Sequence, residues 1–453
     1  MSLRPLNRRE LLTNAAASAL LMPVYRRREW RSREATSAWQ RKRIIRLVHR
    51  AFEQVPLYRD RYREAGIRPC DVRTWDDIAR LPLIDKADLI DGFPDRVVAR
   101  DVRLDDCLLS TSSGSSGRML TIAHRASRNW PYALATQRLL RWCTGSAYPF
   151  WYRQAYIYTS PFPVPEQRFV YPLHFIPTTT DPARMLAQLR AFHPYVLTCY
   201  PSVLRDLIAA DATSMRSLGL HGVSVSSEAS GQDERDAWAA LLGCPVRDEY
   251  SSEELTRIAA QCPHGCYHLM EDITYLEVVD PETGEPTDGV GEIVGTELHN
   301  DAMPFIRYRQ DDLARISSDA CPCGRPSRLL LELTGRANDG FWTTAGEWLS
   351  PGLLLDACYR TLMALPGAIA AYRLVQAKSG CARLDVVPGK AWAEAVPDCL
   401  GAVLSRELDG RLRVTVERVE ALERGAGGKR ATIVRLDDAS DARQAPRLIR
   451  KPA

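Results

Sequence analysis

The sequence predicts an α/β protein in which a large N-terminal domain of parallel or mixed sheets flanked by helices precedes a small C-terminal α+β domain. Short β-rich runs alternate with amphipathic helical runs between Val97 and Ala260, which is typical of parallel sheets covered by helices. After Gln261 the pattern becomes strand, turn, strand, as in an antiparallel region. A chain of 453 residues exceeds what one core normally supports, so we expect more than one domain.

Residues 1–36 are predicted to form a helical N-terminal extension. The motif Asn7-Arg8-Arg9-Glu10-Leu11-Leu12 and the Ala- and Leu-rich run after it faintly resemble a twin-arginine export signal. That run is too short to span a bilayer, and no small-x-small cleavage site precedes the basic residues 26–28. We therefore favour a helix here and a cytoplasmic protein.

The large domain is expected at residues 37–337. Apolar residues recur at helical spacing from Ser37 onward, which predicts a helix that ends near Pro56. Further strands are expected at 155–158, 195–198, 223–225, 273–279 and 291–296, with helices at 185–192 and 201–208.

The small domain is expected at residues 340–453. Its pattern of apolar residues predicts two helices and three strands, enough for a compact unit. The helices are expected at 353–362 and 392–406, and the strands at 371–375, 382–387 and 412–416.

Composition limits the classes of partner. Hydrophobic residues make up 45% and charged residues 26% of the chain, as in ordinary soluble globular proteins. The formal net charge of +4 is small for this length, which argues against nucleic acid as the main partner. We expect neither a nucleic-acid nor a membrane partner, and the sequence does not indicate an oligomeric state.

A run of hydroxyl side chains and glycines at 110–117, followed by Arg118, has the composition of a phosphate-binding loop. Backbone N–H groups, hydroxyls and a guanidinium can surround phosphate oxygens. The run lacks the Gly-Lys-Ser/Thr ending of a Walker loop, and taken alone it is more typical of a linker.

Three later motifs could complete a nucleotide site. Tyr250 offers an aromatic face to a purine, and the neighbouring carboxylates offer oxygen ligands to Mg²⁺. Asp312 follows a strand-like run and could accept both hydroxyls of a ribose. Lys429, on a Gly-rich loop, could act as an electrostatic catalyst delivered by domain movement. Taken alone, the Tyr250 and Asp312 motifs are about equally consistent with a charged surface segment, and Lys429 is more typical of a solvated loop charge.

Four cysteines cluster among prolines and glycines, which indicates a metal site in a reducing compartment. They are Cys262, Cys266, Cys321 and Cys323, and His264 and His268 lie nearby. Three thiolates and one imidazole suit tetrahedral Zn²⁺ with no open position, and such a site is structural.

All these motifs occur in one order, and together they resemble the acyl-adenylate-forming superfamily, which includes acyl-CoA synthetases and adenylation domains. The closest resemblance is to the branch of phenylacetate–CoA ligase and the capsule-biosynthesis adenylating proteins. It rests on Tyr250-x-x-x-Glu254, Gln261-Cys262-Pro263, Tyr267-His268, Pro304-x-Ile-Arg-Tyr-Arg-x-x-Asp-Leu313 and Cys321-Pro-Cys-Gly324, and it covers roughly residues 40 to 435.

The resemblance implies a role for each matching residue. The phosphate cradle would be Ser112, Ser113, Gly114, Ser115, Ser116, Gly117 and Arg118. Around the nucleoside it places Ser227, Glu228 and Asp248 near the adenine, Tyr250 stacked on it, Asp312 at the ribose and Arg336 at ribose or phosphate. Glu254 would bind Mg²⁺, Lys429 would reach the substrate carboxylate and α-phosphate, and the hinge would lie at 338–340, centred on Asp339. The favoured zinc ligands are Cys262, His268, Cys321 and Cys323, with Cys266 and His264 as alternatives.

The implied activity is an ATP-dependent carboxylate ligase. It would form an acyl-AMP from a carboxylic acid, aromatic by analogy with the branch, and release pyrophosphate. The acyl group would then pass to CoA or to an amine. Three departures from the family pattern are Met119 after the phosphate loop, Ser251 after the tyrosine and Glu253 before the magnesium glutamate. Glu253 leaves open which glutamate binds Mg²⁺. With Met119, it also supports the alternative of a non-catalytic nucleotide-binding homologue with a structural zinc.

Overall fold

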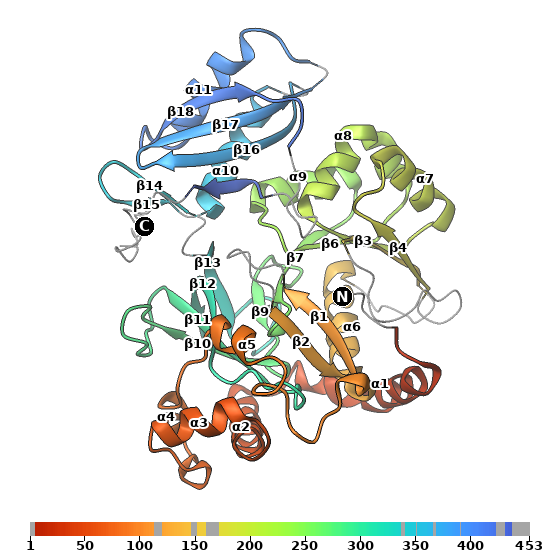
Figure 1. Cartoon of the computed structure of the whole chain (residues 1–453). Helices are drawn as coiled ribbons and strands as arrows, with labels where there is room; N and C mark the ends of the chain where they lie inside the picture. The colour runs from red at the N-terminus through yellow and green to blue at the C-terminus, as the bar shows by residue number, and fades with distance from the viewer. Residues whose placement is uncertain are drawn as a thin grey trace.

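The computed structural model describes residues 5–112, 120–145, 152–159, 172–336, 340–349, 351–365, 368–389, 391–422 and 431–436. Most of the described chain builds one large mixed sheet flanked by helices, and a smaller α+β unit follows it (Figure 1). The mixed α/β class is therefore confirmed. No helix within these described residues is long and apolar enough to cross a membrane.

The large sheet has eleven strands, in the order β10-β11-β12-β13-β9-β8-β7-β6-β5-β3-β4. Strands β3 to β7 pair in parallel, and the others pair antiparallel. The parallel strands are β3 (Gln154–Tyr158), β4 (Leu173–Pro177), β5 (Val196–Cys199), β6 (Gly222–Ser226) and β7 (Val246–Ser252). The antiparallel strands are β8 (Thr256–Gln261), β9 (Tyr267–Leu269), β10 (Thr274–Val279), β11 (Gly291–Glu297), β12 (Tyr308–Ser317) and β13 (Leu329–Arg336).

Helices cover both faces of the parallel half. Val223 and Val225 of β6 share a core with three helices, α7 (Pro182–Phe192), α8 (Pro201–Ser217) and α9 (Gln232–Leu242). Successive strand residues point to opposite faces, so Ser224 and Ser226 face the other side. That side is covered by α6 (Trp130–Thr144), and a Cβ on Gly222 would lie 2.9 Å from the Cys143 sulfur of this helix. The small side chain at residue 222 lets α6 pack closely on the sheet.

The N-terminal helices pack against this body. Helix α1 (Arg8–Arg28) lies along α6, where Tyr25 joins a buried cluster with Leu134 and Leu139. The remaining N-terminal helices are α2 (Arg33–Gln54), α3 (Pro56–Glu64), α4 (Trp75–Ala79) and α5 (Lys86–Gly92), with short 3-10 turns at Pro69–Asp71, Leu104–Asp106 and Ala126–Arg128. The hairpin of β1 (Cys107–Ser112) and β2 (Leu120–Arg125) lies in front of the sheet in Figure 1.

The C-terminal unit has a core of its own, built around Leu374, Leu384 and Leu400. Its four-stranded sheet runs β18-β17-β16-β19 and carries two helices. The elements are β14 (Phe341–Trp342), β15 (Trp348–Leu349), α10 (Pro351–Met363), β16 (Ile369–Lys378), β17 (Cys381–Pro388), α11 (Val396–Glu407), β18 (Arg413–Arg418) and β19 (Ile433–Arg435).

Candidate active site and metal centre

Two of the predicted nucleoside-binding residues meet directly. The Tyr250 hydroxyl donates to Asp312 Oδ2 at 2.5 Å, joining β7 to β12. Arg336 is the register partner of Asp312 on β13, so its backbone lies beside the same carboxylate. Residues from three strands thus converge, one strand (β7) from the parallel half of the sheet and two (β12 and β13) from the antiparallel half.

Glu254 lies in the turn between β7 and β8 and is buried. Its Oε1 is 3.6 Å from Lys86 Nζ and accepts a 3.3 Å hydrogen bond from the Tyr308 hydroxyl. The neighbouring Glu253 is exposed. The structure therefore turns Glu254 toward the inside of the molecule and Glu253 toward its surface.

Asp248 is held by two partners. The Tyr267 hydroxyl donates to its Oδ2 at 2.5 Å, and Arg235 Nη1 lies 3.9 Å from the same oxygen. Burial raises the pKa of Asp248 above its usual range, and Arg235 opposes that shift. Its backbone N–H donates to Gln261 Oε1 at 3.0 Å, which fixes β7 next to β8.

Ser227 and Glu228 follow β6 in a constrained turn. Ser227 has a φ of 68°, a backbone conformation that non-glycine residues rarely adopt and that often marks functional sites. Glu228 accepts hydrogen bonds from the backbone N–H and the hydroxyl of Ser202, at 2.9 and 3.0 Å. A carboxylate at the N-terminus of α8 is stabilised by the helix dipole. This contact orients the β6–α9 connection.

The predicted phosphate loop connects β1 and β2. Ser112 is buried and pairs with Leu120 across the hairpin, so the two ends of the loop are held together. Residues 113–118 lie outside the described residues, as do Lys429 and, of the predicted hinge, residues 338 and 339.

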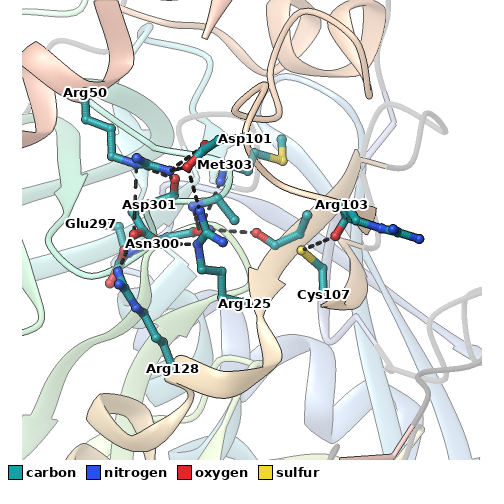
Figure 2. A network of polar contacts seen from close by, with 12 residues as sticks. Arg50, Asp101, Arg103, Cys107, Arg125, Arg128, Glu297, Asn300, Asp301 and Met303 are labelled. Carbon is teal, nitrogen blue, oxygen red and sulfur yellow. Dashed lines mark hydrogen bonds and ion pairs between the residues drawn. The ribbon is translucent and has the colours of Figure 1, made fainter. Parts of the chain in front are cut away.

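An ionic network anchors this hairpin to the sheet (Figure 2). Arg125, the last residue of β2, binds Asp301 at 3.0 Å and Asp101 at 3.3 Å. Arg50 and Arg128 also bind Asp301, and Asn300 donates to the Ala123 carbonyl at 3.1 Å. One largely buried carboxylate thus binds three guanidinium groups at the base of the predicted phosphate loop.

The metal cluster assembles from two separate segments. Cys262 and His268 come from the β8–β9 region, while Cys321 and Cys323 come from the loop before β13. Their four ligand atoms all lie within 4.8 Å of one another. The Cys262 and Cys321 sulfurs are 3.7 Å apart. This agrees with a tetrahedral zinc, whose bonds of about 2.3 Å place its sulfur ligands about 3.8 Å apart.

The surroundings of the cluster orient its ligands. His268 Nε2 lies 3.2 Å from the Cys323 sulfur, and its Nδ1 lies 2.8 Å from the Ser327 hydroxyl. An outer hydrogen bond of this kind fixes the ring that ligates a metal. Burial lowers the pKa of His268 to about 4, which keeps the imidazole neutral, as ligation requires. Of the two alternative ligands, neither Cys266 nor His264 belongs to the cluster of four.

Two contacts at this site were not predicted. Lys86 reaches Glu254 from the first turn of α5, and the buried Arg307 donates to the Leu81 carbonyl at 2.5 Å, which holds the approach to α5 against the sheet. One sequence signal could have drawn attention to Lys86, because only six of the 60 Lys and Arg residues in the chain are lysines.

Comparison with known proteins identifies the relatives of this chain. The phenylacetate–coenzyme A ligase of Thermus thermophilus is 27% identical over 361 residues, which cover 77% of this chain and 80% of that protein. The chain is homologous to the phenylacetate–coenzyme A ligases. The corresponding ligase of Pseudomonas putida is 28% identical over 344 residues, covering 72% of this chain and 75% of its own. The predicted resemblance to the acyl-adenylate-forming superfamily is confirmed, although no family model matches the chain.

Solved structures share the fold. A 2-hydroxyisobutyryl-CoA ligase in its postadenylation state superposes with a TM-score of 0.77 at 22% identity, covering 91% of this chain and 92% of that one. An open conformation of that enzyme gives 0.60 at 22% identity, over 88% of this chain and 91% of the other. An anthranilate–CoA ligase gives 0.53 at 16% identity, over 73% and 67% of the two chains.

Proposed function

We propose that the protein is an ATP-dependent acid–CoA ligase that proceeds through an acyl-adenylate. The carboxylate of the acid attacks the α-phosphorus of ATP, and pyrophosphate leaves. CoA then attacks the acyl carbon through its sulfur, AMP leaves, and a thioester forms. The homologous phenylacetate–coenzyme A ligases support both steps. An amine is a second possible acceptor.

The contact between Tyr250 and Asp312 is the observation that carries the proposal. It holds a planar ring beside a carboxylate, with the Tyr250 hydroxyl oxygen 2.5 Å from Asp312 Oδ2. The ring would stack on the adenine, while Asp312 would accept the ribose hydroxyls. Asp248, Ser227 and Glu228 would complete the adenine side of the site, and Arg336 the phosphate side.

Charge neutralisation would come from several directions. Glu254 fits a magnesium site, because Mg²⁺ in nucleotide sites commonly takes one or two carboxylates together with substrate phosphates. That ion would neutralise triphosphate charge. Lys86 is close enough to Glu254 to act on the same phosphates. We assign the cradle to Ser112–Arg118 and the α-phosphate contact to Lys429, in accordance with the resemblance.

We further propose that residues 37–337 and 340–453 form two domains that rotate about 338–340 between the two half-reactions. The separate core of the C-terminal unit supports this division. For the metal cluster we propose a structural Zn²⁺, because three thiolates and a neutral imidazole at tetrahedral spacing leave no position open. The twelve cysteines are free of disulfides, which supports the cytoplasm as the compartment.

One observation favours a second candidate, a nucleotide-binding homologue without catalysis. The ammonium of Lys86 already neutralises Glu254, and it could replace a magnesium ion there.

Pyrophosphate release over a panel of carboxylic acids, with and without CoA, distinguishes the two candidates. We expect acid-dependent release and, with CoA, a thioester. Binding of ATP without turnover for any acid would instead establish the non-catalytic candidate.

A further inference from the structure

Buried polar side chains gather at the carboxyl ends of the parallel strands. Tyr158 ends β3 and Ser226 ends β6, and their hydroxyl oxygens lie 2.7 Å apart. Ser226 pairs in register with Glu249 of β7. Open α/β sheets bind their ligands at this edge, so the position favours a binding role over a purely structural one.

Glu249 has an unused hydrogen-bond acceptor. Its side chain is fully buried, and one carboxylate oxygen, Oε1, forms an ion pair with Arg257. The other oxygen, Oε2, has no hydrogen-bond partner among the described residues. Buried polar atoms are normally paired, because an unpaired one loses its hydration without compensation.

Two guanidinium nitrogens close to Glu249 already have partners. Arg257 Nη1 binds Glu249, and its Nη2 donates to the Thr136 hydroxyl of α6 at 3.3 Å. Burial raises the pKa of Tyr158, and the charge of Glu249 raises it further, so the phenol stays protonated beside Ser226. Among the described residues, Glu249 Oε2 thus still lacks a hydrogen-bond donor.

The cluster adjoins the proposed adenylate site. Glu249 immediately precedes Tyr250, and adjacent strand residues point to opposite faces of a sheet. Glu249 consequently lies on the face that α6 covers, while the Tyr250 hydroxyl reaches Asp312. Glu249 thus lies between α6 and the strands, one residue along β7 from the proposed adenine contact.

We propose that Glu249, supported by Arg257, Tyr158 and Ser226, selects carboxylic acids that carry a hydroxyl or amino group at the end remote from the carboxylate. This inference rests on the proposed ligase function and names the substrate class of that site. Phenylacetate, the acid in the names of the homologues, has no such donor. A second carboxylate on the acid would be repelled by Glu249.

The test is ATP–pyrophosphate exchange by the full chain with matched acids. The set is phenylacetate, its 4-hydroxy and 4-amino derivatives, and 4-methoxyphenylacetate, which keeps the oxygen but has no donor. We expect kcat/KM for the hydroxy and amino acids to exceed that for the other two by about 10- to 100-fold. A higher rate with phenylacetate or the methoxy acid would overturn the inference and leave the ligase function standing. If none of the acids supports exchange, both the ligase function and the inferred substrate class are overturned.

A double variant tests the role of Glu249 without leaving an unpaired buried charge that would destabilise the fold. Glu249→Leu combined with Arg257→Met removes both charges, which avoids leaving one buried and unpaired. This variant should lose the preference and accept phenylacetate best. The matched control is Asp272→Leu with Arg138→Met, which removes another buried ion pair of α6, bonded at 2.6 Å. The control should keep the wild-type order of acids. If the Glu249→Leu, Arg257→Met variant keeps the wild-type order of acids, the role of Glu249 in selecting the acid is refuted.

Discussion

Lys86 Nζ lies 3.6 Å from Glu254 Oε1, although α5 and the β7–β8 turn are far apart in the sequence. A cation and a carboxylate at this spacing can exchange partners when a triphosphate and a metal ion enter. Glu254 would then bind the metal, and Lys86 would bind phosphate oxygens.

We predict that Lys86→Met raises KM for ATP by about tenfold or more, because a charge-assisted contact to phosphate is lost. The measurement is pyrophosphate release against ATP concentration. Lys42→Met is the control, since Lys42 is exposed on α2. An unchanged KM for ATP would show that Lys86 serves only to hold Glu254.

Tyr250 allows stacking and hydrogen bonding to be separated. Tyr250→Phe keeps the ring and removes the bond to Asp312, so the Kd for ATP should change little. Tyr250→Ala removes the ring, and loss of base stacking should weaken ATP binding by about tenfold or more. Equal effects of the two variants would contradict a stacking role. Calorimetric titration with ATP measures both.

The metal cluster predicts about one zinc per purified chain. Cys323→Ser and His268→Gln should each lose the metal and lower Tm. Cys70→Ser, at an exposed cysteine, should change neither. Elemental analysis and thermal unfolding provide the two readouts, and a metal-free protein of unchanged Tm would reject a structural zinc.

Asp301 binds three arginines at the base of the β1–β2 hairpin. Asp301→Ala should lower the free energy of unfolding by about 1–3 kcal/mol, because the partly buried Arg50 and Arg125 each lose one of two carboxylate partners. It should also raise KM for ATP, since the hairpin carries the predicted phosphate loop. Arg128→Ala should cost less than about 1 kcal/mol, as that side chain is 59% exposed. Chemical denaturation checks both values.

Glu297 predicts a pH dependence of stability. Burial raises the pKa of Glu297 from 4.5 to about 7. Between these values the folded state binds more protons than the unfolded state, so this residue stabilises the fold at low pH and the effect is lost as pH rises through 7. Glu297→Gln should therefore gain stability over the wild type between pH 5 and 8, by at most about 3 kcal/mol. Exposed Glu285→Gln is the control, and parallel pH profiles of Glu297→Gln and the wild type would contradict the prediction.

Periodicity and motif chemistry predicted much of this molecule. The helix expected at 201–208 lies within α8, and the strand expected at 223–225 lies within β6, because local apolar patterns determine both. Cys262, His268, Cys321 and Cys323 could be grouped because few residue types make a metal site. The Lys86–Glu254 contact could not be predicted, since it depends on how α5 packs on the sheet. The free acceptor of Glu249 likewise emerges only from the packing of α6 and β8 around it.

The docking of α1 has a consequence for synthesis of the chain. Glu29, at the end of this helix, binds Arg138 and Arg141 of α6 and lies 4.0 Å from Arg325, near the metal cluster. Ribosomes add about 5–20 residues per second, so this helix emerges roughly 15–60 s before Arg325 exists to receive it. Its contacts with α6 can form as soon as that helix has been made, whereas its contact with Arg325 waits for the loop beside the metal cluster. Helix α1 can therefore dock in two stages, first on α6 and then on this loop.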